Sequence, residues 1–394
     1  MDNKHLWVAV MAGGEGTRLF PISYPGRPKQ FCQLDDKNTF IQATISNFVS
    51  LGIKTNQVVA ITTNKCQTEL AKEQVLPRGL LSQNICQINP NWGYPGAMYQ
   101  ATKFIAEIDP EAIVICTPSD HYLKATDDDF AYTVKTAVAE AENGYPVLIG
   151  VKVHDLVTAT GCGHAIFEDT GDGCYEVVDF VEKPNEKLAD KIMRRDDSAC
   201  NTGIVVWKAS TLLDSIDEQE VWGIGTDEFL NKFETLKIAV GDFAWVDCGN
   251  YESLFGVLPK TPHHKNACIG EGTFERVRCR GSLLHALEGT ELSVCGAKDT
   301  AVIFTTIDDR PILVVADLER SQGIKELAED YYRNEKLLKK DFSLFGARNN
   351  IVLGSNISDE LIVAFVGVSN YAVYVRKRAN GVLEAAVSHQ LPNE

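Results

Sequence analysis

Over the first 150 residues the chain alternates near-continuous apolar runs with segments of helical periodicity. The apolar runs are LWVAVM at 6–11, QVVAIT at 57–62 and AIVICTP at 112–118. Runs of this kind predict strands that are buried on both faces. The segments between them predict helices over Thr39–Leu51, Asn64–Val75, Gly96–Ile108 and Asp127–Glu142. The pattern therefore predicts an α/β fold, with a Rossmann-like, mixed and mostly parallel sheet flanked by helices.

The alternation of strands and helices becomes less regular after Val151, and the composition changes near Pro259–Pro262. Beyond that point short Val- and Ile-rich runs alternate with Gly, Asn and Asp turns, which predicts a β-rich module. A charged helix over Ser321–Lys340 is expected to interrupt it. We therefore expect two domains, one over residues 1–259 and a smaller, β-rich one over residues 260–394.

Composition and charge narrow the class of protein. A chain of 394 residues is too long for one ordinary core, and its 44% hydrophobic and 23% charged residues are typical of a globular protein in water. A formal net charge of −16 argues against nucleic acid or an anionic membrane as the main partner. The longest apolar runs, such as Leu361–Val368, are far too short to span a bilayer.

The N-terminus and the cysteines indicate a compartment. The first apolar run is only one strand long and leads directly into glycines, unlike a secretory signal peptide. The eleven cysteines include no C-x-x-C pair, and several, such as Cys116 and Cys295, lie in apolar runs. We expect all of them to be reduced, in a cytoplasmic protein without a zinc site or a disulfide framework.

A glycine-rich turn with local positive charge follows the first strand. It lies in AGGEGTRLFPISYPGRPKQFCQL, where Arg18, Arg27 and Lys29 against one acid leave a charge of +2 over Gly13–Leu34. Consecutive glycines let backbone N–H groups approach phosphate oxygens. The stretch matches neither familiar phosphate fingerprint, and glycine-rich turns are also common without a ligand. The added guanidinium and ammonium groups favour a polyphosphate site.

Two carboxylates follow apolar strands far apart in the sequence. Asp120 comes after AIVIC, and Asp247 comes after FAWV. Ligands of open α/β sheets gather where the strands end, and Mg²⁺ prefers two carboxylates plus substrate phosphate oxygens. Each aspartate alone is more often a cap or turn residue than a metal ligand. Two carboxylates from separate strand ends can share one Mg²⁺ ion.

At this point the sequence resembles a known family. The motifs GGEGTRLFPISYPGRPKQF, TPSDH, TGCGHAI, DFVEKP, NTGIVVW and WVDCGNYESL, in this order between Trp7 and Leu258, are similar to those of the sugar nucleotidyltransferases. The P-K-Q-F ending is most similar to mannose-1-phosphate guanylyltransferases. The resemblance implies the nucleotide-diphospho-sugar transferase fold and a Mg²⁺-assisted attack of α-D-mannose 1-phosphate on GTP. It also implies β-helix-like rungs in the C-terminal part that assist subunit contacts, hence a homodimer or higher homo-oligomer.

The same resemblance implies roles for individual residues. Arg18 and Lys29 would stabilise the leaving pyrophosphate, and Asp120 and Asp247 would hold Mg²⁺. The nucleotide would contact Ala12, Gly13, Gly14, Gly16, Thr17, Gly96 and Ser119. The sugar phosphate would contact Gly163, Glu182, Lys183, Asn201 and Gly203. His121 is not expected to act as a general base, because the attacking phosphate oxygen is already anionic.

One stretch departs from the family pattern. The base-recognition loop of most mannose-1-phosphate guanylyltransferases carries E-P…R-N-T-A, whereas this chain has INPNWGYPGAMYQATKF. Trp92 and Tyr94 could pack on a purine, although loop aromatics usually cover core. The alternatives that stay open are the same chemistry with another nucleoside triphosphate or hexose 1-phosphate, and a non-catalytic, nucleotide-sugar-sensing regulatory subunit.

Overall fold

The computed structural model describes residues 4–14, 16–35, 37–124, 128–169, 173–307, 310–319, 324–333, 351–353, 362–366, 368, 371–377 and 382–389. The chain forms two compact units. The first comprises Met1–Gly14 and Phe40–Asp247, and the second comprises Glu15–Thr39 and Cys248–Glu394. The glycine-rich turn is thus divided between them. The division expected at Pro259–Pro262 stays a prediction, because compactness alone does not show which segments fold independently.

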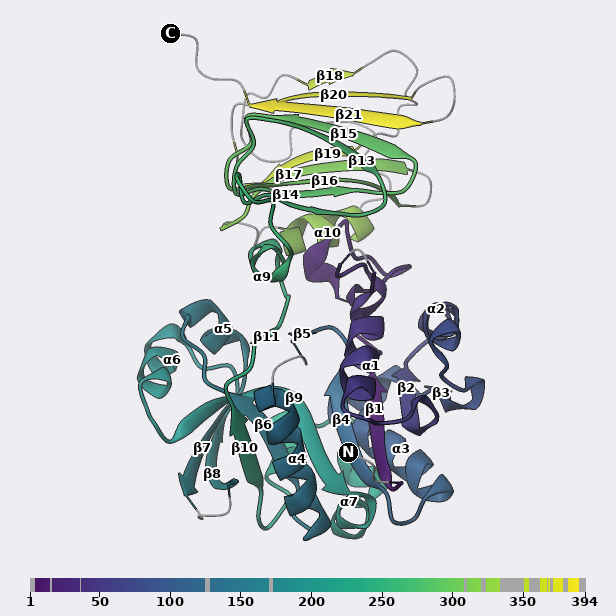
Figure 1. Cartoon of the computed structure of the whole chain (residues 1–394), viewed down its shortest axis with the longest axis vertical. Helices are drawn as coiled ribbons and strands as arrows, with labels where there is room; N and C mark the ends of the chain where they lie inside the picture. The colour runs from purple at the N-terminus through teal and green to yellow at the C-terminus, as the bar shows by residue number, and fades with distance from the viewer. Residues whose placement is uncertain are drawn as a thin grey trace. The chain divides into compact units, whose positions relative to one another are not determined.

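In the described part of the first unit, nine strands form one mixed sheet in the order β3-β2-β1-β4-β9-β6-β10-β8-β7 (Figure 1). Their bounds are β1 Leu6–Met11, β2 Val58–Thr62, β3 Ile85–Gln87, β4 Ile113–Pro118, β6 Val147–Val151, β7 His164–Asp169, β8 Tyr175–Val181, β9 Ser198–Lys208 and β10 Lys237–Gly241. Following the pairings outward from β1, β8 and β9 run opposite to the other strands. The sheet is therefore mixed, with most strands in one direction.

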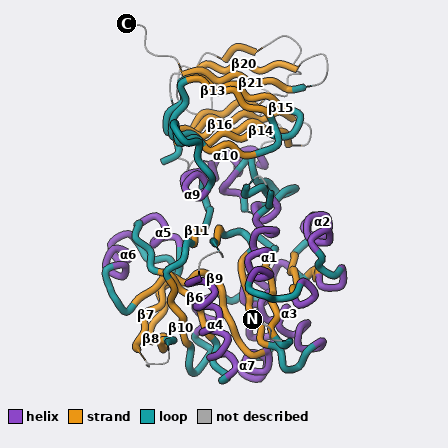
Figure 2. Tube along the Cα trace, viewed as in Figure 1, coloured by secondary structure: helices purple, strands orange, loops and turns teal. Residues whose placement is uncertain are grey.

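Helices cover both faces of this sheet. They are α1 Phe40–Ser50, α2 Lys65–Val75, α3 Gly93–Ile108, α4 Asp128–Glu142, α5 Leu156–Gly161, α6 Glu186–Met193, α7 Ala209–Ser215 and α8 Thr226–Leu230 (Figure 2). Trp7, Ala9 and Met11 of β1 share a core with α3 and α7. Val8 and Val10 point to the other face and are also fully buried. Burial of alternate residues on both faces explains the continuous apolar runs of the sequence.

The four predicted helices are confirmed as α1 to α4. Asn64 caps α2, where its side chain accepts a hydrogen bond from the backbone of Gln67. Helix α3 begins at Gly93, three residues before the predicted start. The predicted start of α4, Asp127, lies outside the described residues. No helix of the described ranges is both long and apolar enough to cross a bilayer.

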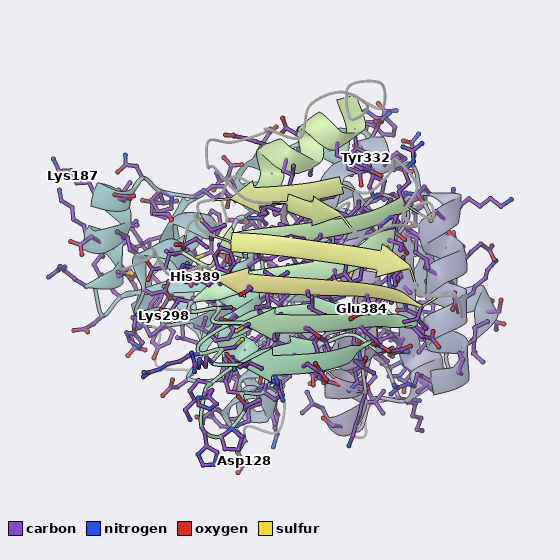
Figure 3. All side chains as sticks on the ribbon, turned by 90° about the horizontal axis from the view of Figure 1, so that it is seen from above. Asp128, Lys187, Lys298, Tyr332, Glu384 and His389 are labelled. Carbon is purple, nitrogen blue, oxygen red and sulfur yellow. A yellow bond between two sulfur atoms is a disulfide. The ribbon has the colours of Figure 1, made fainter. Side chains whose placement is uncertain are left out.

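The second unit is β-rich. Its described strands form two five-stranded sheets, β12-β14-β16-β17-β19 and β13-β15-β21-β20-β18. The bounds are β12 Ala267–Ile269, β13 Thr273–Val277, β14 Leu283–Ala286, β15 Thr290–Cys295, β16 Thr300–Ile307, β17 Arg310–Asp317, β18 Ile351–Leu353, β19 Ile362–Val366, β20 Tyr371–Lys377 and β21 Leu383–His389. Figure 3 labels Glu384, the second residue of β21, and His389, its last residue.

From β12 to β16, successive strands of this unit alternate between its two sheets. β12, β14 and β16 are parallel neighbours in one sheet, and β13 and β15 are parallel neighbours in the other. This is how the rungs of a β-helix are built. Apolar side chains of both sheets, such as Leu284, Phe304 and Val387, form the core between them.

Two helices of this unit contact its N-terminal segment. They are α9 Tyr251–Val257 and α10 Ile324–Arg333. The ring of Phe20 packs against Tyr331 of α10, with centroids 5.2 Å apart, and its carbonyl accepts a hydrogen bond from the hydroxyl of Tyr251. These contacts explain why residues 15–39 cluster with the C-terminal part of the chain. The remainder of the helix predicted over Ser321–Lys340 lies outside the described residues.

Candidate active site

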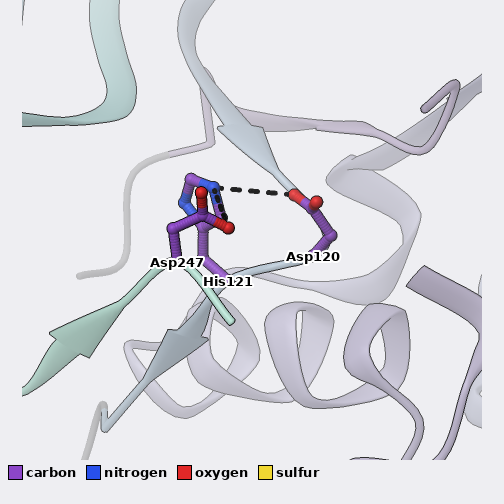
Figure 4. A group of neighbouring side chains, drawn as sticks. All are labelled: Asp120, His121 and Asp247. Atoms are coloured by element: carbon purple, nitrogen blue, oxygen red, sulfur yellow. Dashed lines mark ion pairs between the residues drawn. The ribbon is translucent and has the colours of Figure 1, made fainter. Parts of the chain in front are cut away.

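The two predicted metal ligands lie together in the first unit, with a histidine between them (Figure 4). Nε2 of His121 is 3.6 Å from Oδ1 of Asp120 and 3.9 Å from Oδ1 of Asp247. Ligand atoms of all three residues lie within 4.8 Å of one another. All three side chains are partly exposed, so a small ion and a substrate phosphate have access from solvent.

The pairing of two very short strands brings the aspartates together. β5, Tyr122–Leu123, follows Asp120 and His121, and β11, Trp245–Val246, precedes Asp247. The strands are antiparallel, and Tyr122 lies opposite Val246. In this register the residue before Tyr122 faces the residue after Val246. Asp247 therefore reaches the site from a separate two-stranded sheet, and not from a strand of the main sheet.

Trp245 fixes which nitrogen of His121 carries the proton. Its Nε1–H donates a hydrogen bond to Nδ1 of His121 across 3.3 Å. Because an indole can only donate, Nδ1 accepts, and the proton of the neutral imidazole sits on Nε2. That nitrogen faces the two carboxylates and has no lone pair to offer a metal ion. The donor set is then two carboxylate oxygens, which is the chemistry that Mg²⁺ prefers.

The first residues of the glycine-rich turn are anchored to the sheet and to α2. Ala12 donates its backbone N–H to the carbonyl of Ile61 at 2.7 Å. The carbonyl of Gly13 accepts from the hydroxyl of Thr63 at 3.0 Å, and Nε2 of Gln67 bonds the carbonyls of Gly13 and Gly14 at 3.1 and 3.3 Å. These bonds fix the peptide planes of the turn, and Gly14 itself is exposed.

Gln67 was not predicted as a site residue. It is almost fully buried in the first turn of α2, an unusual position for an amide. Ser119, predicted to contact the nucleotide, is also buried, and its hydroxyl donates to the carbonyl of Met11 at 2.7 Å. This bond joins the end of β4 to the end of β1. The nucleotide contacts of Ala12, Gly13, Gly14 and Ser119 stay predictions.

The basic residues of the turn belong to the second unit. Gly16 has a φ of +60°, and any side chain there would overlap Cβ of Lys29, so this position requires glycine. Thr17 begins a short 3₁₀ helix that includes Arg18, which is exposed and whose guanidinium lies against Gly249. Lys29 is 2% exposed. The roles of Gly16, Thr17, Arg18 and Lys29 toward phosphate stay predictions.

The residues predicted for the sugar phosphate lie close together in the first unit. The backbone N–H of Asn201 donates to the carbonyl of Gly163 at 2.8 Å. A Cβ at Gly163 would lie 2.6 Å from Oε2 of Glu182. Nζ of Lys183 is 3.5 Å from Oε1 of Glu182 and its side chain is 66% exposed. Lys183 also has a φ of +43°, which is rare for a residue with a side chain and is frequent at functional sites.

Gly203 lies next to Asn201 of the predicted sugar-phosphate residues and close to His121 beside the carboxylates. Its φ is +77°, its N–H donates to Oδ1 of Asn201 at 3.0 Å, and a Cβ there would lie 2.9 Å from Pro118 and 3.9 Å from Cε1 of His121. Its carbonyl accepts from the hydroxyl of Tyr94 at 2.9 Å. Burial raises the pKa of that phenol well above its ordinary value. Tyr94 therefore supports the backbone beside the site.

The predicted base-recognition loop is well packed in the first unit. Gly96 is buried in α3, where a Cβ would lie 2.8 Å from Trp92. The ring of Trp92 meets Trp222 edge-on, with centroids 4.4 Å apart. This packing accounts for the glycine without a ligand, so the nucleotide contact of Gly96 stays a prediction.

The expectation that every cysteine is reduced is wrong for one pair. Cys162 and Cys200 form a disulfide, with Cα atoms 6.2 Å apart. Cys162 lies two residues before the start of β7, and Cys200 lies in β9, opposite His164. The pairing of β7 with β9 brings together two cysteines that are 38 residues apart in sequence. Cys32 is a buried thiol, and burial raises its pKa to about 12.

Comparisons with known proteins identify the family of the chain. Residues 8–263 match the nucleotidyl transferase family, so the chain belongs to it. The chain is 28% identical over 369 residues to a mannose-1-phosphate guanylyltransferase of Escherichia coli (strain K12), across 84% of this chain and 74% of the relative. It is 24% identical over 414 residues to mannose-1-phosphate guanylyltransferase 2 of Escherichia coli O157:H7, across 93% and 83%.

A solved structure supports the fold. The chain superposes on a Thermus thermophilus protein described as a mannose-1-phosphate geranyltransferase, with a TM-score of 0.68 and 22% identity. The superposition covers 83% of this chain and 99% of that one. The nucleotide-diphospho-sugar transferase fold and the resemblance to the sugar nucleotidyltransferases are thereby confirmed.

Proposed function

We propose that this protein is a mannose-1-phosphate guanylyltransferase, which forms GDP-mannose and pyrophosphate from GTP and α-D-mannose 1-phosphate. The single observation that carries the proposal is the convergence of Asp120 and Asp247 beside Gly203 and His121. The similarity of most of the chain to mannose-1-phosphate guanylyltransferases supports the choice of substrates.

The reaction makes one bond and breaks one. An anionic oxygen of mannose 1-phosphate attacks the α-phosphorus of GTP, and the bond from that phosphorus to the bridging oxygen of the β-phosphate breaks, so that pyrophosphate leaves with the electron pair. No proton has to be removed from the attacking oxygen. Catalysis therefore depends on alignment and on neutralisation of charge.

In the proposal, different residues of the chain align the substrates and neutralise their charge. Asp120 and Asp247 would hold Mg²⁺, which when bound neutralises and orients the triphosphate. The Nε2–H of His121 faces both carboxylates, at 3.6 and 3.9 Å. Lys183 meets the phosphate of the sugar phosphate, while Glu182 and Asn201 bind sugar hydroxyls. Arg18 and Lys29 meet the departing pyrophosphate.

Pyrophosphate release from purified full-length protein tests this function. Each of GTP, ATP, UTP and dTTP is paired with mannose 1-phosphate and glucose 1-phosphate in the presence of Mg²⁺. The proposal expects GTP with mannose 1-phosphate to give the highest kcat/KM. Pyrophosphate release from a different pair would support the same reaction with other substrates. Pyrophosphate release from no pair would contradict the proposal that the protein is an enzyme. Mg²⁺ dependence, a homo-oligomeric state and a cytoplasmic location belong to the same proposal.

A further inference from the structure

The second unit contains a cavity of about 400 Å³, in the size range of small-molecule sites. One wall is the segment that follows the glycine-rich turn, including Arg27 and Gln33. The other wall comes from the rungs of the β-helix-like sheets, including His285 and Thr305. Every residue that lines the cavity belongs to this unit. None of them is among the residues assigned to nucleotidyl transfer.

His285 presents an unsatisfied acceptor to this cavity. The residue is 8% exposed, and its Nδ1 is the one buried side-chain nitrogen or oxygen of the described residues without a hydrogen-bond partner. The backbone of Phe304 acts to raise the pKa of the ring, so we assign the proton of the neutral ring to Nε2 and the acceptor to the unpartnered Nδ1. Burial, followed by the charge of Arg27, lowers the pKa of His285 to about 4, so the ring is neutral. A buried acceptor of this kind calls for a donor from a ligand.

Arg27 supplies donors on the facing wall. It closes a tight turn with Tyr24, since each residue donates its backbone N–H to the carbonyl of the other at 2.8 and 3.1 Å. Among the described residues, no carboxylate forms an ion pair with its guanidinium. The turn thus holds a cation against the cavity in a fixed backbone conformation.

Two carboxylates set the charge that a ligand can carry. Glu271 and Glu288 line the cavity and are exposed, so they stand at its solvent side. With Arg27 at +1 and each glutamate at −1, and with His285 neutral, the lining has a formal charge of −1. A multiply charged phosphate would be repelled. Carboxylates, a neutral imidazole acceptor and a guanidinium together suit a molecule with many hydroxyl groups.

We propose that this cavity binds a polyhydroxylated small molecule with at most one negative charge, that is, a free sugar or a sugar acid. Its hydroxyls donate to His285, Glu271 and Glu288, and its oxygens accept from Arg27. Arg27 lies two residues before Lys29, whose Cβ packs against Gly16. We therefore infer that occupancy of the cavity changes the position of the glycine-rich turn that carries Arg18 and Lys29. This regulatory part rests on the proposed function.

Binding is measured on the full-length chain by saturation-transfer difference NMR and calorimetry, with D-mannose, D-glucose and D-glucuronate as probes. The Asp120→Asn/Asp247→Asn variant serves as background, so that turnover plays no part. The proposal expects at least one probe to bind saturably, and the exposed-site variants Glu271→Gln and Glu288→Gln to weaken that binding at least tenfold. Glu252→Gln, an exposed acid of α9 outside the cavity, is the matched control and leaves binding unchanged.

A second variant addresses the orphan nitrogen directly. His285→Leu removes the acceptor, and its fold is checked by circular dichroism before its affinity is compared. Loss of binding in a folded His285→Leu protein supports the proposal. Absence of saturable binding by all three probes, or binding that the cavity variants leave unchanged, overturns it. Pyrophosphate release by the wild-type protein is recorded separately, so failure of this site is distinct from failure of the proposed function.

Discussion

The indole Nε1 of Trp245 donates a hydrogen bond to Nδ1 of His121, and the two rings meet edge-on with centroids 5.2 Å apart. Trp245 is almost fully buried and precedes Asp247 by two residues. The same short strand therefore positions one carboxylate and sets the proton of the histidine between the two carboxylates. This relationship leads to the first prediction.

Replacing Trp245 by Phe should remove the preference of His121 for the Nε2–H tautomer. The imidazole then exchanges between Nδ1–H and Nε2–H forms, and loss of one hydrogen bond lowers the free energy of unfolding by about 1 kcal/mol. ¹⁵N NMR of the histidine side chains at neutral pH measures the tautomer. Trp222→Phe, which removes a half-exposed indole elsewhere, is the control. A pure Nε2–H form in Trp245→Phe would show that the indole does not set the tautomer.

Gly203→Ala should destabilise the protein, because its φ of +77° disfavours a side chain and a Cβ would crowd Pro118 at 2.9 Å. We expect the free energy of unfolding in urea to fall by about 1–3 kcal/mol. KM for the sugar phosphate should rise, since the same glycine is a predicted sugar-phosphate contact and its N–H donates to Oδ1 of Asn201. Gly161→Ala is the matched control, because a Cβ at Gly161 meets no atom within 4 Å. Equal stability of the two variants would contradict the close packing at Gly203.

His285 should make stability depend on pH in a defined window. Its pKa falls from 6.5 to about 4 on folding, with burial as the main cause and Arg27 as the second. The unfolded chain therefore binds more protons between these values, and stability falls as the pH drops from 6.5 toward 4, by up to roughly 3 kcal/mol. Urea titrations at about pH 7 and about pH 4.5, which span most of this window, measure how far the free energy of unfolding falls. They are done on the wild type and on His285→Gln. A wild-type loss no larger than that of the variant would contradict a buried neutral imidazole.

Much of the fold was predictable from the sequence. Continuous apolar runs at β1, β2 and β4 identify buried strands because both faces of the sheet are covered. Helix α2 was predictable from its cap, Asn64. The reversal of β8 and β9 was not, because strand direction depends on pairings between residues far apart in the chain. The disulfide of Cys162 with Cys200 was missed for the same reason, since it follows from the pairing of β7 with β9.

The candidate site, like the fold, was predictable from the sequence only in part. Two aspartates after apolar strands predicted a shared cation, and they do lie together. The register of Tyr122 with Val246 that joins them involves only two-residue strands, which leave no periodic signal. Gln67 was missed because nothing in its sequence context shows that the first turn of α2 faces the glycine turn. These contacts depend on tertiary packing, which local patterns do not encode.

The central claim is that Asp120 and Asp247 together hold one divalent cation. Mn²⁺ binding to the full-length protein, followed by electron paramagnetic resonance without nucleotide or sugar phosphate, tests it most directly. We predict one Mn²⁺ site in the wild type and at least tenfold weaker binding in both Asp120→Asn and Asp247→Asn. Asp242→Asn, an exposed acid just before β11, should bind as the wild type does. Equal Mn²⁺ affinity in all four proteins would contradict the claim.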